Sequence, residues 1–184
     1  MYGETYASDF ICRKRDEWQI PYERGIAKTG VVASIEGRGN QSGRAIALRA
    51  DIDAPDIIEA SGQPWSSETP GKIHGCSHDG HTATLLTAAR YLQKTRDFDG
   101  IVRLVFQPAE VGGRGACTML QEGLLDRFPF DEIYGHHNWP GFPRGQFAIL
   151  TRRIPRGAPR RTHRCWSGEP DSASPCNFNL RSSH

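Results

Sequence analysis

The chain has 184 residues, of which 37% are hydrophobic and 24% are charged, and its net charge is +2. This length suits one domain with its own core, and no apolar run is long enough to cross a bilayer, which argues against a membrane protein. The first ten residues have neither a basic lead nor an apolar stretch, so they do not resemble a secretory signal, and we expect a cytoplasmic protein.

The first part of the chain predicts a helix, two strands and a long loop. Residues 8–20 space three large apolar side chains among charges as an amphipathic helix does, and Pro21 would end that helix. Residues 29–37 and 44–52 are rich in β-branched and apolar residues between glycines, which predicts two strands that pair as a hairpin or are otherwise adjacent. Residues 53–80 are rich in proline, glycine and serine, as loops are.

The next part predicts helices that alternate with strands. Residues 81–95 place leucine and alanine at helical spacing on one face, which indicates an amphipathic helix. Residues 100–107 predict a buried strand, and residues 112–125 predict a second helix after a glycine turn. Residues 131–139 predict a strand that runs into a loop, and residues 145–150 predict a last strand.

Strands and helices of these lengths in alternation predict an α/β fold of three layers, with a mixed, mostly parallel sheet flanked by helices. In such sheets the chemistry lies in loops beyond the carboxyl ends of the strands. Polar side chains occupy those places in this sequence: Asp51, Asp53, Glu110, His136 and His137.

The end of the chain differs in composition from the rest. Residues 151–184 hold seven of the 23 basic residues and two of the 21 acidic residues, mixed with proline, serine and cysteine. A basic tail can bind nucleic acid, but this one has no lysine, no repeat and no apolar period. We therefore expect a disordered basic tail and no nucleic-acid partner.

Cys76 and His78 form a local pair of the kind that zinc sites combine with ligands from distant loops. The alternative is a loop histidine that caps the following helix, beside a buried free cysteine. The distant candidate ligands or bases are His137, Glu110, Asp51 and Asp53.

These distant candidates also have alternative interpretations. A carboxylate such as Glu110 in a dry pocket is a good general base, because burial raises its proton affinity and a metal lowers the pKa of bound water to about 7. The alternative for Glu110 is a surface glutamate before a glycine turn. Asp51 and Asp53 fit solvated carboxylates at a turn, and we expect at most one of them to face a site directly. His136 and His137 fit either a ligand with its neighbour or a polar strand end.

Four segments occur in this order along the chain: ALRADIDA, HGCSHDGHTATLL, FQPAEVGGRGA and YGHHNWPGFPRGQFA. Together they resemble the metal-dependent amidohydrolase and peptidase family that includes hippurate hydrolase, bacterial N-acyl-amino-acid amidohydrolases and plant auxin-conjugate hydrolases. The resemblance covers roughly residues 1–150, and it implies the N-terminal part of a catalytic domain like that of zinc exopeptidases, here incomplete.

The resemblance also implies a site and a reaction. Cys76 would be a thiolate that bridges two divalent metal ions, which are zinc, manganese, cobalt or nickel in this family, and His78 and His137 would be terminal ligands. Asp53 would orient a ligand. Glu110 would be the base that deprotonates a metal-bound water and then protonates the leaving amine. The substrate would be an N-acyl amino acid or a similar small amide, and family members often form homo-oligomers through a lid domain absent here.

The sequence also departs from the family. The family has two adjacent glutamates after the Pro–Ala pair, and the second position here is Val111, which cannot bind a metal. Ser77 replaces a glycine, which matters if that backbone requires a positive φ. After residue 150 the sequence no longer resembles the family, which is what a shifted reading frame followed by a stop codon would produce. The expected lid domain and a last histidine ligand are therefore missing from the resemblance. The alternative to an active hydrolase is therefore a catalytically inactive, truncated remnant that binds one metal or none.

Overall fold

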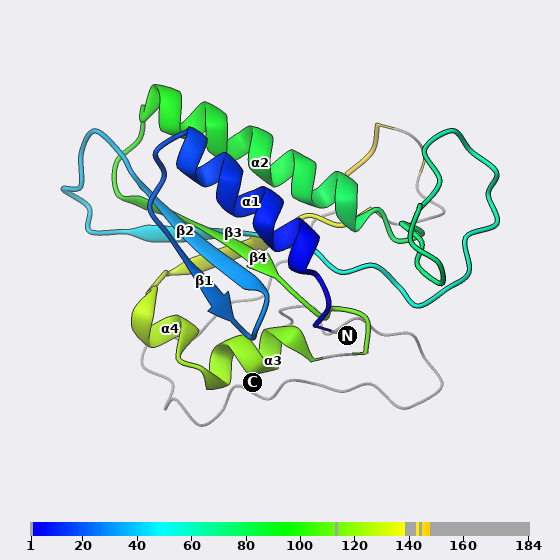
Figure 1. Ribbon diagram of the computed structural model, residues 1–184. Helices are drawn as coiled ribbons and strands as arrows, with labels where there is room; N and C mark the ends of the chain where they lie inside the picture. Colours follow the sequence, from blue (N-terminus) through cyan, green and yellow to red (C-terminus); the bar gives the residue numbers. More distant parts are fainter. Residues whose placement is uncertain (1, 113, 139–142, 144, 148–184) are drawn as a thin grey trace.

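The computed structural model describes residues 2–112, 114–138, 143 and 145–147. A five-stranded mixed sheet lies between two layers of helices (Figure 1), which confirms the expected α/β class. Helices α1 and α2 cover one face of the sheet, and α3 and α4 cover the other. The elements in chain order are α1 (Thr5–Glu17), β1 (Tyr22–Ile26), β2 (Gly30–Glu36), β3 (Ala45–Asp51), α2 (His78–Thr95), β4 (Ile101–Gln107), α3 (Gly115–Gln121), α4 (Leu124–Arg127) and β5 (Glu132–Gly135).

The strand order is β1-β2-β4-β3-β5, so β4 lies at the centre of the sheet. The pairs β1–β2 and β2–β4 are antiparallel, whereas β3–β4 and β3–β5 are parallel. The expectation that β2 and β3 pair or lie adjacent is wrong, because β4 lies between them. The three parallel strands β4, β3 and β5 end at the same edge of the sheet, and this edge carries the polar residues that follow them.

The helices differ from the expected ranges at their ends. α1 begins at Thr5 and α2 at His78, each three residues earlier than expected. The expected helix over residues 112–125 is two short helices, because Gly123 adopts a left-handed conformation with φ of 86° between them. Of the expected strand at residues 145–150, the described part 145–147 is not in a strand, and the rest lies outside the described residues.

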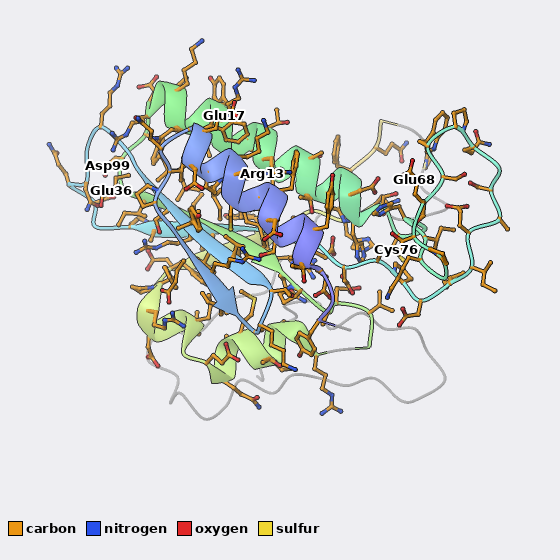
Figure 2. The ribbon with its side chains drawn as sticks, in the orientation of Figure 1. Arg13, Glu17, Glu36, Glu68, Cys76 and Asp99 are labelled. Atoms are coloured by element: carbon orange, nitrogen blue, oxygen red, sulfur yellow. The ribbon has the colours of Figure 1, made fainter. Side chains whose placement is uncertain are left out.

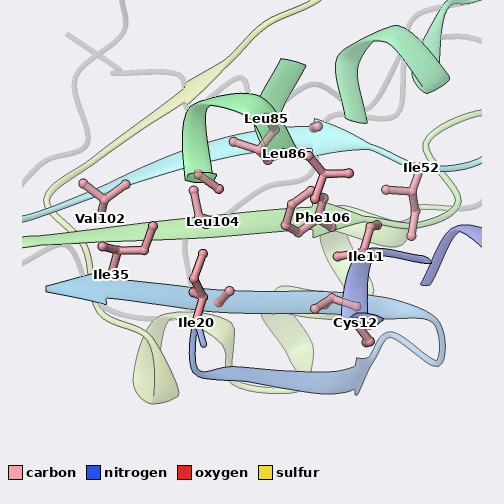
Figure 3. Close-up of a cluster of buried hydrophobic side chains, with 14 residues drawn as sticks. Ile11, Cys12, Ile20, Ile35, Ile52, Leu85, Leu86, Val102, Leu104 and Phe106 are labelled. Atoms are coloured by element: carbon pink, nitrogen blue, oxygen red, sulfur yellow. The ribbon is translucent and has the colours of Figure 1, made fainter. Parts of the chain in front are cut away.

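The main core lies between the sheet and the two long helices (Figure 3). Alternate residues of β4 point into it, namely Val102, Leu104 and Phe106, whereas Val105 points to the opposite face, toward α3 and α4. This alternation follows from the period of two along a strand, and burial on both faces explains why β4 is apolar at five of its seven positions. Among the described residues, no helix is long and apolar enough to cross a membrane.

The connection from β3 through α2 to β4 sets the position of the candidate site. The long loop after β3 carries the chain to the start of α2, which then runs back across the sheet to β4. Because parallel strands need such a crossover, the first turn of α2 lies over the carboxyl ends of β3 and β4. Histidines in this turn therefore meet the acidic side chains that follow those two strands.

Candidate metal centre

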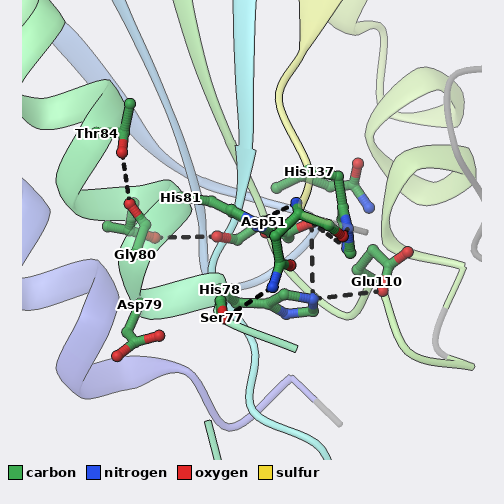
Figure 4. A network of polar contacts seen from close by, with 12 residues as sticks. Asp51, Ser77, His78, Asp79, Gly80, His81, Thr84, Glu110 and His137 are labelled. Atoms are coloured by element: carbon green, nitrogen blue, oxygen red, sulfur yellow. Dashed lines mark hydrogen bonds and ion pairs between the residues drawn. The ribbon is translucent and has the colours of Figure 1, made fainter. Parts of the chain in front are cut away.

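Four segments contribute side chains to one buried polar cluster (Figure 4). Asp51 is the last residue of β3, and Glu110 lies three residues after the end of β4. His78 and His81 lie in the first turn of α2, and His137 follows β5 by two residues. All five side chains meet at the carboxyl edge of the parallel strands, which is where the sequence pattern placed the chemistry.

The ring of His78 is 1% exposed, and its two nitrogens have different surroundings. Nδ1 lies 2.9 Å from the carbonyl oxygen and 3.0 Å from Oδ1 of Asp53, so Nδ1–H is the donor to that residue. Nε2 has no hydrogen-bond partner among the described residues, and it lies 3.7 Å from Asp51 Oδ2 and 3.8 Å from Glu110 Oε2. Nε2 therefore faces two buried carboxylates.

His137 is arranged in the same way. Its Nδ1 donates to the carbonyl oxygen of Asn138 over 2.6 Å, and its Nε2 lies 3.9 Å from Asp51 Oδ2. Histidines that bind metals usually donate their second ring N–H to an oxygen, which fixes both the tautomer and the direction of the free nitrogen. Both His78 and His137 meet this requirement. The neighbouring His136 is exposed, with its ring 5.3 Å from that of His81.

His81 is a residue of the cluster that the sequence interpretation missed. Its Nδ1 lies 2.7 Å from Asp51 Oδ1, and its Nε2 accepts a hydrogen bond from the Asn138 N–H over 3.1 Å. The two histidines of the His78-x-x-His81 sequence share one helix face, and this spacing was the signal for a second histidine at the site. Because both ring nitrogens have partners, His81 orients Asp51 and the segment after β5.

Asp51 accepts hydrogen bonds on both carboxylate oxygens. The buried guanidinium of Arg49 donates to Oδ2 over 2.8 Å, and it also donates to Gln107 over 2.9 Å. Burial alone would raise the pKa of Asp51, but the His81 hydrogen bond and the charges of Arg49 and His78 outweigh it and lower this pKa to about 2. Asp51 is therefore an anion at neutral pH.

Asp53 also faces the cluster. Its Oδ1 contacts His78 and its Oδ2 accepts a hydrogen bond from the Val111 N–H over 2.9 Å. The expectation that at most one of Asp51 and Asp53 faces a site is wrong, and so is the interpretation of both as solvated carboxylates, since Asp51 is 0% and Asp53 6% exposed. Residues i and i+2 of an extended chain project to the same side.

Glu110 is 4% exposed, so its interpretation as a surface glutamate is wrong. Its Oε1 has no hydrogen-bond partner among the described residues. Burial raises the pKa of Glu110 above the ordinary value, although the positive charges of Arg49 and His78 oppose the shift. A buried carboxylate with raised proton affinity has the properties of a general base.

The ligand atoms of Asp51, His78, His81 and His137 lie within 4.8 Å of one another. Imidazole nitrogens with a carboxylate oxygen form a donor set that suits zinc, manganese, cobalt and nickel. The buried Nε2 of His78 without a partner is the observation that fits a bound cation, because a buried polar atom is ordinarily satisfied. The described residues therefore fit a divalent metal.

Cys76 does not belong to this group of four. It is a half-buried free cysteine just before α2, at the end of the long loop (Figure 2). Burial raises the pKa of its thiol, and the negative charges of Glu110, Asp53 and Asp51 raise it further. A thiolate here thus requires a neighbouring cation, and the role of Cys76 as a metal ligand stays a prediction.

Comparison with known proteins agrees with this geometry. Residues 47–175 match the model of peptidase family M20/M25/M40. The chain is 40% identical over 139 residues to a hippurate hydrolase of Campylobacter jejuni, and 46% identical over 149 residues to an N-acetyl-L-cysteine deacetylase of Bacillus subtilis. The matches cover 76% and 80% of this chain, which spans only 36% and 35% of the two relatives.

A solved structure gives the same result. The fold is similar to that of the Bacillus subtilis YxeP protein, described as a dinuclear metal-binding peptidase of the M20 family. The TM-score is 0.69 at 40% sequence identity, and the match covers 76% of this chain and 39% of that structure. The predicted resemblance is thereby confirmed, and the chain belongs to peptidase family M20/M25/M40.

Proposed function

We propose that this chain carries the base and metal ligands for hydrolysis of the amide bond in N-acyl amino acids or similar small amides. The single observation that supports this most directly is the position of His78 Nε2 at the sheet edge, 3.7 Å from Asp51 Oδ2 and 3.8 Å from Glu110 Oε2. The names of the matched relatives, a hippurate hydrolase and an N-acetyl-L-cysteine deacetylase, support a small acylated amino acid as the substrate.

The protein residues have separate roles in this proposal. His78, His137 and Asp51 hold a divalent metal, and Cys76 adds a thiolate when two ions bind. A divalent metal at such a site polarises the substrate carbonyl and lowers the pKa of water. Asp53 acts on the ring of His78, because its oxygen fixes which nitrogen carries the proton.

Glu110 is the proton carrier of the reaction. It takes a proton from the attacking water as the new carbon–oxygen bond forms, and it gives that proton to the amide nitrogen as the carbon–nitrogen bond breaks. The products are a carboxylic acid and an amino acid. The raised pKa of Glu110 suits both steps, since the carboxylate must bind a proton and then release it near neutral pH.

The first prediction concerns Glu110→Gln, which keeps the size of the side chain but cannot carry the proton. We expect hydrolysis of hippurate or N-acetyl amino acids to fall by about 10²–10⁴-fold, since general acid–base catalysis contributes this much. Metal binding, measured by calorimetry on the same sample, should stay unchanged because Glu110 is not among the proposed ligands. Glu68→Gln, on the exposed long loop (Figure 2), is the matched control. Unchanged turnover in Glu110→Gln would remove the role given to this residue.

A second candidate function is metal binding without turnover. The observation that favours it is Val111, an apolar residue beside the proposed base, 41% exposed, at a position where the family resemblance predicts a carboxylate ligand. Metal content and hydrolysis measured on one sample separate the two candidates. Bound metal without hydrolysis favours the second, whereas hydrolysis that a chelator abolishes and added metal restores favours the first.

A further inference from the structure

The residue before the proposed base has an unusual backbone. Ala109 is 1% exposed and has a φ of 47°, in the left-handed region that residues with a Cβ rarely adopt. Such a conformation persists only where the surrounding structure holds it, and it often occurs beside functional groups. The direction of Glu110 depends on this conformation, because the next peptide starts from it.

Two contacts from outside the loop hold the backbone of Ala109. Its N–H donates to Oε1 of Glu4 over 3.2 Å, and its carbonyl oxygen accepts from the N–H of Gly115 over 3.0 Å. Both polar groups of this residue are thus bonded, one of them to a side chain that lies 105 positions earlier in the sequence. Glu4 is the only described side chain with a hydrogen bond to this N–H.

Glu4 occupies the N-cap position of α1 but makes no side-chain hydrogen bond to its own helix. Instead, its second carboxylate oxygen accepts a hydrogen bond from Oγ1 of Thr29 over 2.6 Å. Thr29 directly precedes β2 and is 8% exposed. The carboxylate therefore joins the start of α1, the turn before β2 and the loop after β4, and Figure 1 shows the N-terminal segment beside that loop.

We propose that Glu4 is a positioning residue for the general base: its carboxylate holds Ala109 in the left-handed conformation that directs Glu110 into the metal centre. This inference rests on the function proposed above for Glu110. Without the acceptor, the Ala109 N–H is buried without a partner, and the peptide relaxes toward a right-handed conformation. Asp51 and His78 belong to β3 and α2, so the metal ligands keep their places.

The test compares Glu4→Met with Glu4→Gln, which differ in whether the end of the side chain can accept a hydrogen bond. In Glu4→Met we expect hydrogen exchange at the Ala109 amide of the metal-free protein to become at least about tenfold faster. In Glu4→Gln, whose oxygen still accepts this bond, exchange should stay within about threefold of the unchanged chain. Glu17→Met, at the exposed end of α1 (Figure 2), is the control for loss of a charge.

Kinetics and metal binding complete the test. Where the unchanged chain hydrolyses substrate, Glu4→Met should lower kcat about tenfold or more, with KM and metal content within about twofold, and Glu4→Gln should restore kcat. Should Glu4→Met fail to fold, Glu4→Asp keeps the charge but is one methylene shorter, and it should show the same loss.

Several results overturn the inference. Unchanged hydrogen exchange at Ala109 in folded Glu4→Met would refute it. An equally large increase in the exchange rate at the β4 amides of Leu104 and Phe106 would also refute it, because this would indicate a general loosening of the fold. Faster exchange with unchanged kcat refutes the link to Glu110. If the unchanged chain has no activity at all, the proposed function fails on its own, and exchange at Ala109 still decides whether Glu4 holds this backbone.

Discussion

Arg15 lies on the inner face of α1, where its guanidinium is fully buried against aromatic rings. Its Cζ is 4.6 Å from the ring centre of Trp18 and 5.8 Å from that of Phe106. None of its three nitrogens has a hydrogen-bond partner among the described residues, and burial lowers its pKa to about 10. A buried cation without an anionic partner costs stability, because it has lost its hydration.

We therefore expect Arg15→Met to stabilise the protein by about 1–3 kcal/mol, measured as a higher midpoint of urea unfolding. The gain is what remains after the loss of the two ring contacts, which are worth about 0.5–2 kcal/mol. Arg13→Met, on the exposed side of the same helix (Figure 2), should change stability by no more than about 0.5 kcal/mol. A lower midpoint for Arg15→Met would show that the ring contacts exceed the cost of burial.

Single residues of the site were predictable from the sequence to different degrees. His78, His137 and Glu110 follow strand ends or begin a helix, so pattern and resemblance both led to them. His81 was missed because only the local Cys-x-His pair was considered as a ligand pair, although His81 lies in the same helix turn as His78. Ser77 has a φ of 60° in the structure, which is a left-handed conformation that glycine adopts more easily than serine. The replacement of a glycine by Ser77 therefore matters for this backbone. A backbone angle of this kind follows from the contacts of the folded chain, which no local pattern contains.

At the scale of elements, α3 approaches the loop after β4 so closely that only a glycine fits at its first position. A Cβ on Gly115 would lie 1.7 Å from the carbonyl oxygen of Pro108, far inside any contact distance. The atom it would meet belongs to the backbone, so no side-chain rotation can relieve the clash. This contact keeps α3 against the loop that carries Glu110.

Gly115→Ala should destabilise the protein by about 1–3 kcal/mol, the usual cost of overpacking, and should also displace the Glu110 loop. Gly80→Ala is the opposite case, because a Cβ on Gly80 would meet only Ser77 Cβ, at 3.9 Å, on the exposed side of α2. There we expect stabilisation by about 0.5–1 kcal/mol, since alanine favours the helix more than glycine does. Thermal unfolding should show a lower midpoint for Gly115→Ala and a higher midpoint for Gly80→Ala. The same change in midpoint for both variants would contradict the close approach of α3.

Elements with a strong periodic pattern were predicted, and those without one were not. α2 and β4 were expected because leucine spacing identifies the helix and a mostly apolar, β-branched segment identifies the strand. β1 was missed because Tyr22–Ile26 is a mostly exposed edge strand with a glycine and two charges among its five residues. The order of the strands could not be predicted, since the neighbours of β4 come from distant parts of the chain.

At the scale of the whole molecule, the buried anion of Asp51 makes stability depend on pH. Its pKa is lowered from 3.8 to about 2, so the stabilisation is present above pH 3.8 and is lost as the pH falls through about 2. The shift corresponds to about 2 kcal/mol. This stabilisation from the ionised carboxylate links the sheet, α2 and the segment after β5, because Arg49, His78 and His81 surround Asp51.

Asp51→Asn removes the ionisation and should flatten the acid side of the stability curve. The difference in unfolding free energy between the unchanged chain and this variant should be about 2 kcal/mol larger at pH 6 than at pH 2. Urea unfolding of metal-free protein across this range measures it. A difference that stays constant with pH would mean that Asp51 has the same pKa in the folded and unfolded chains.

The central position of β4 has a consequence for how the protein is made. β4 begins 50 residues after the end of β3, yet it alone joins the β1–β2 hairpin to β3. At about 5–20 residues per second, a ribosome needs several seconds to add the missing strand. During that interval the hairpin, β3 and the apolar face of α2 have no common sheet to pack on. We expect the growing chain to depend on chaperones until β4 emerges.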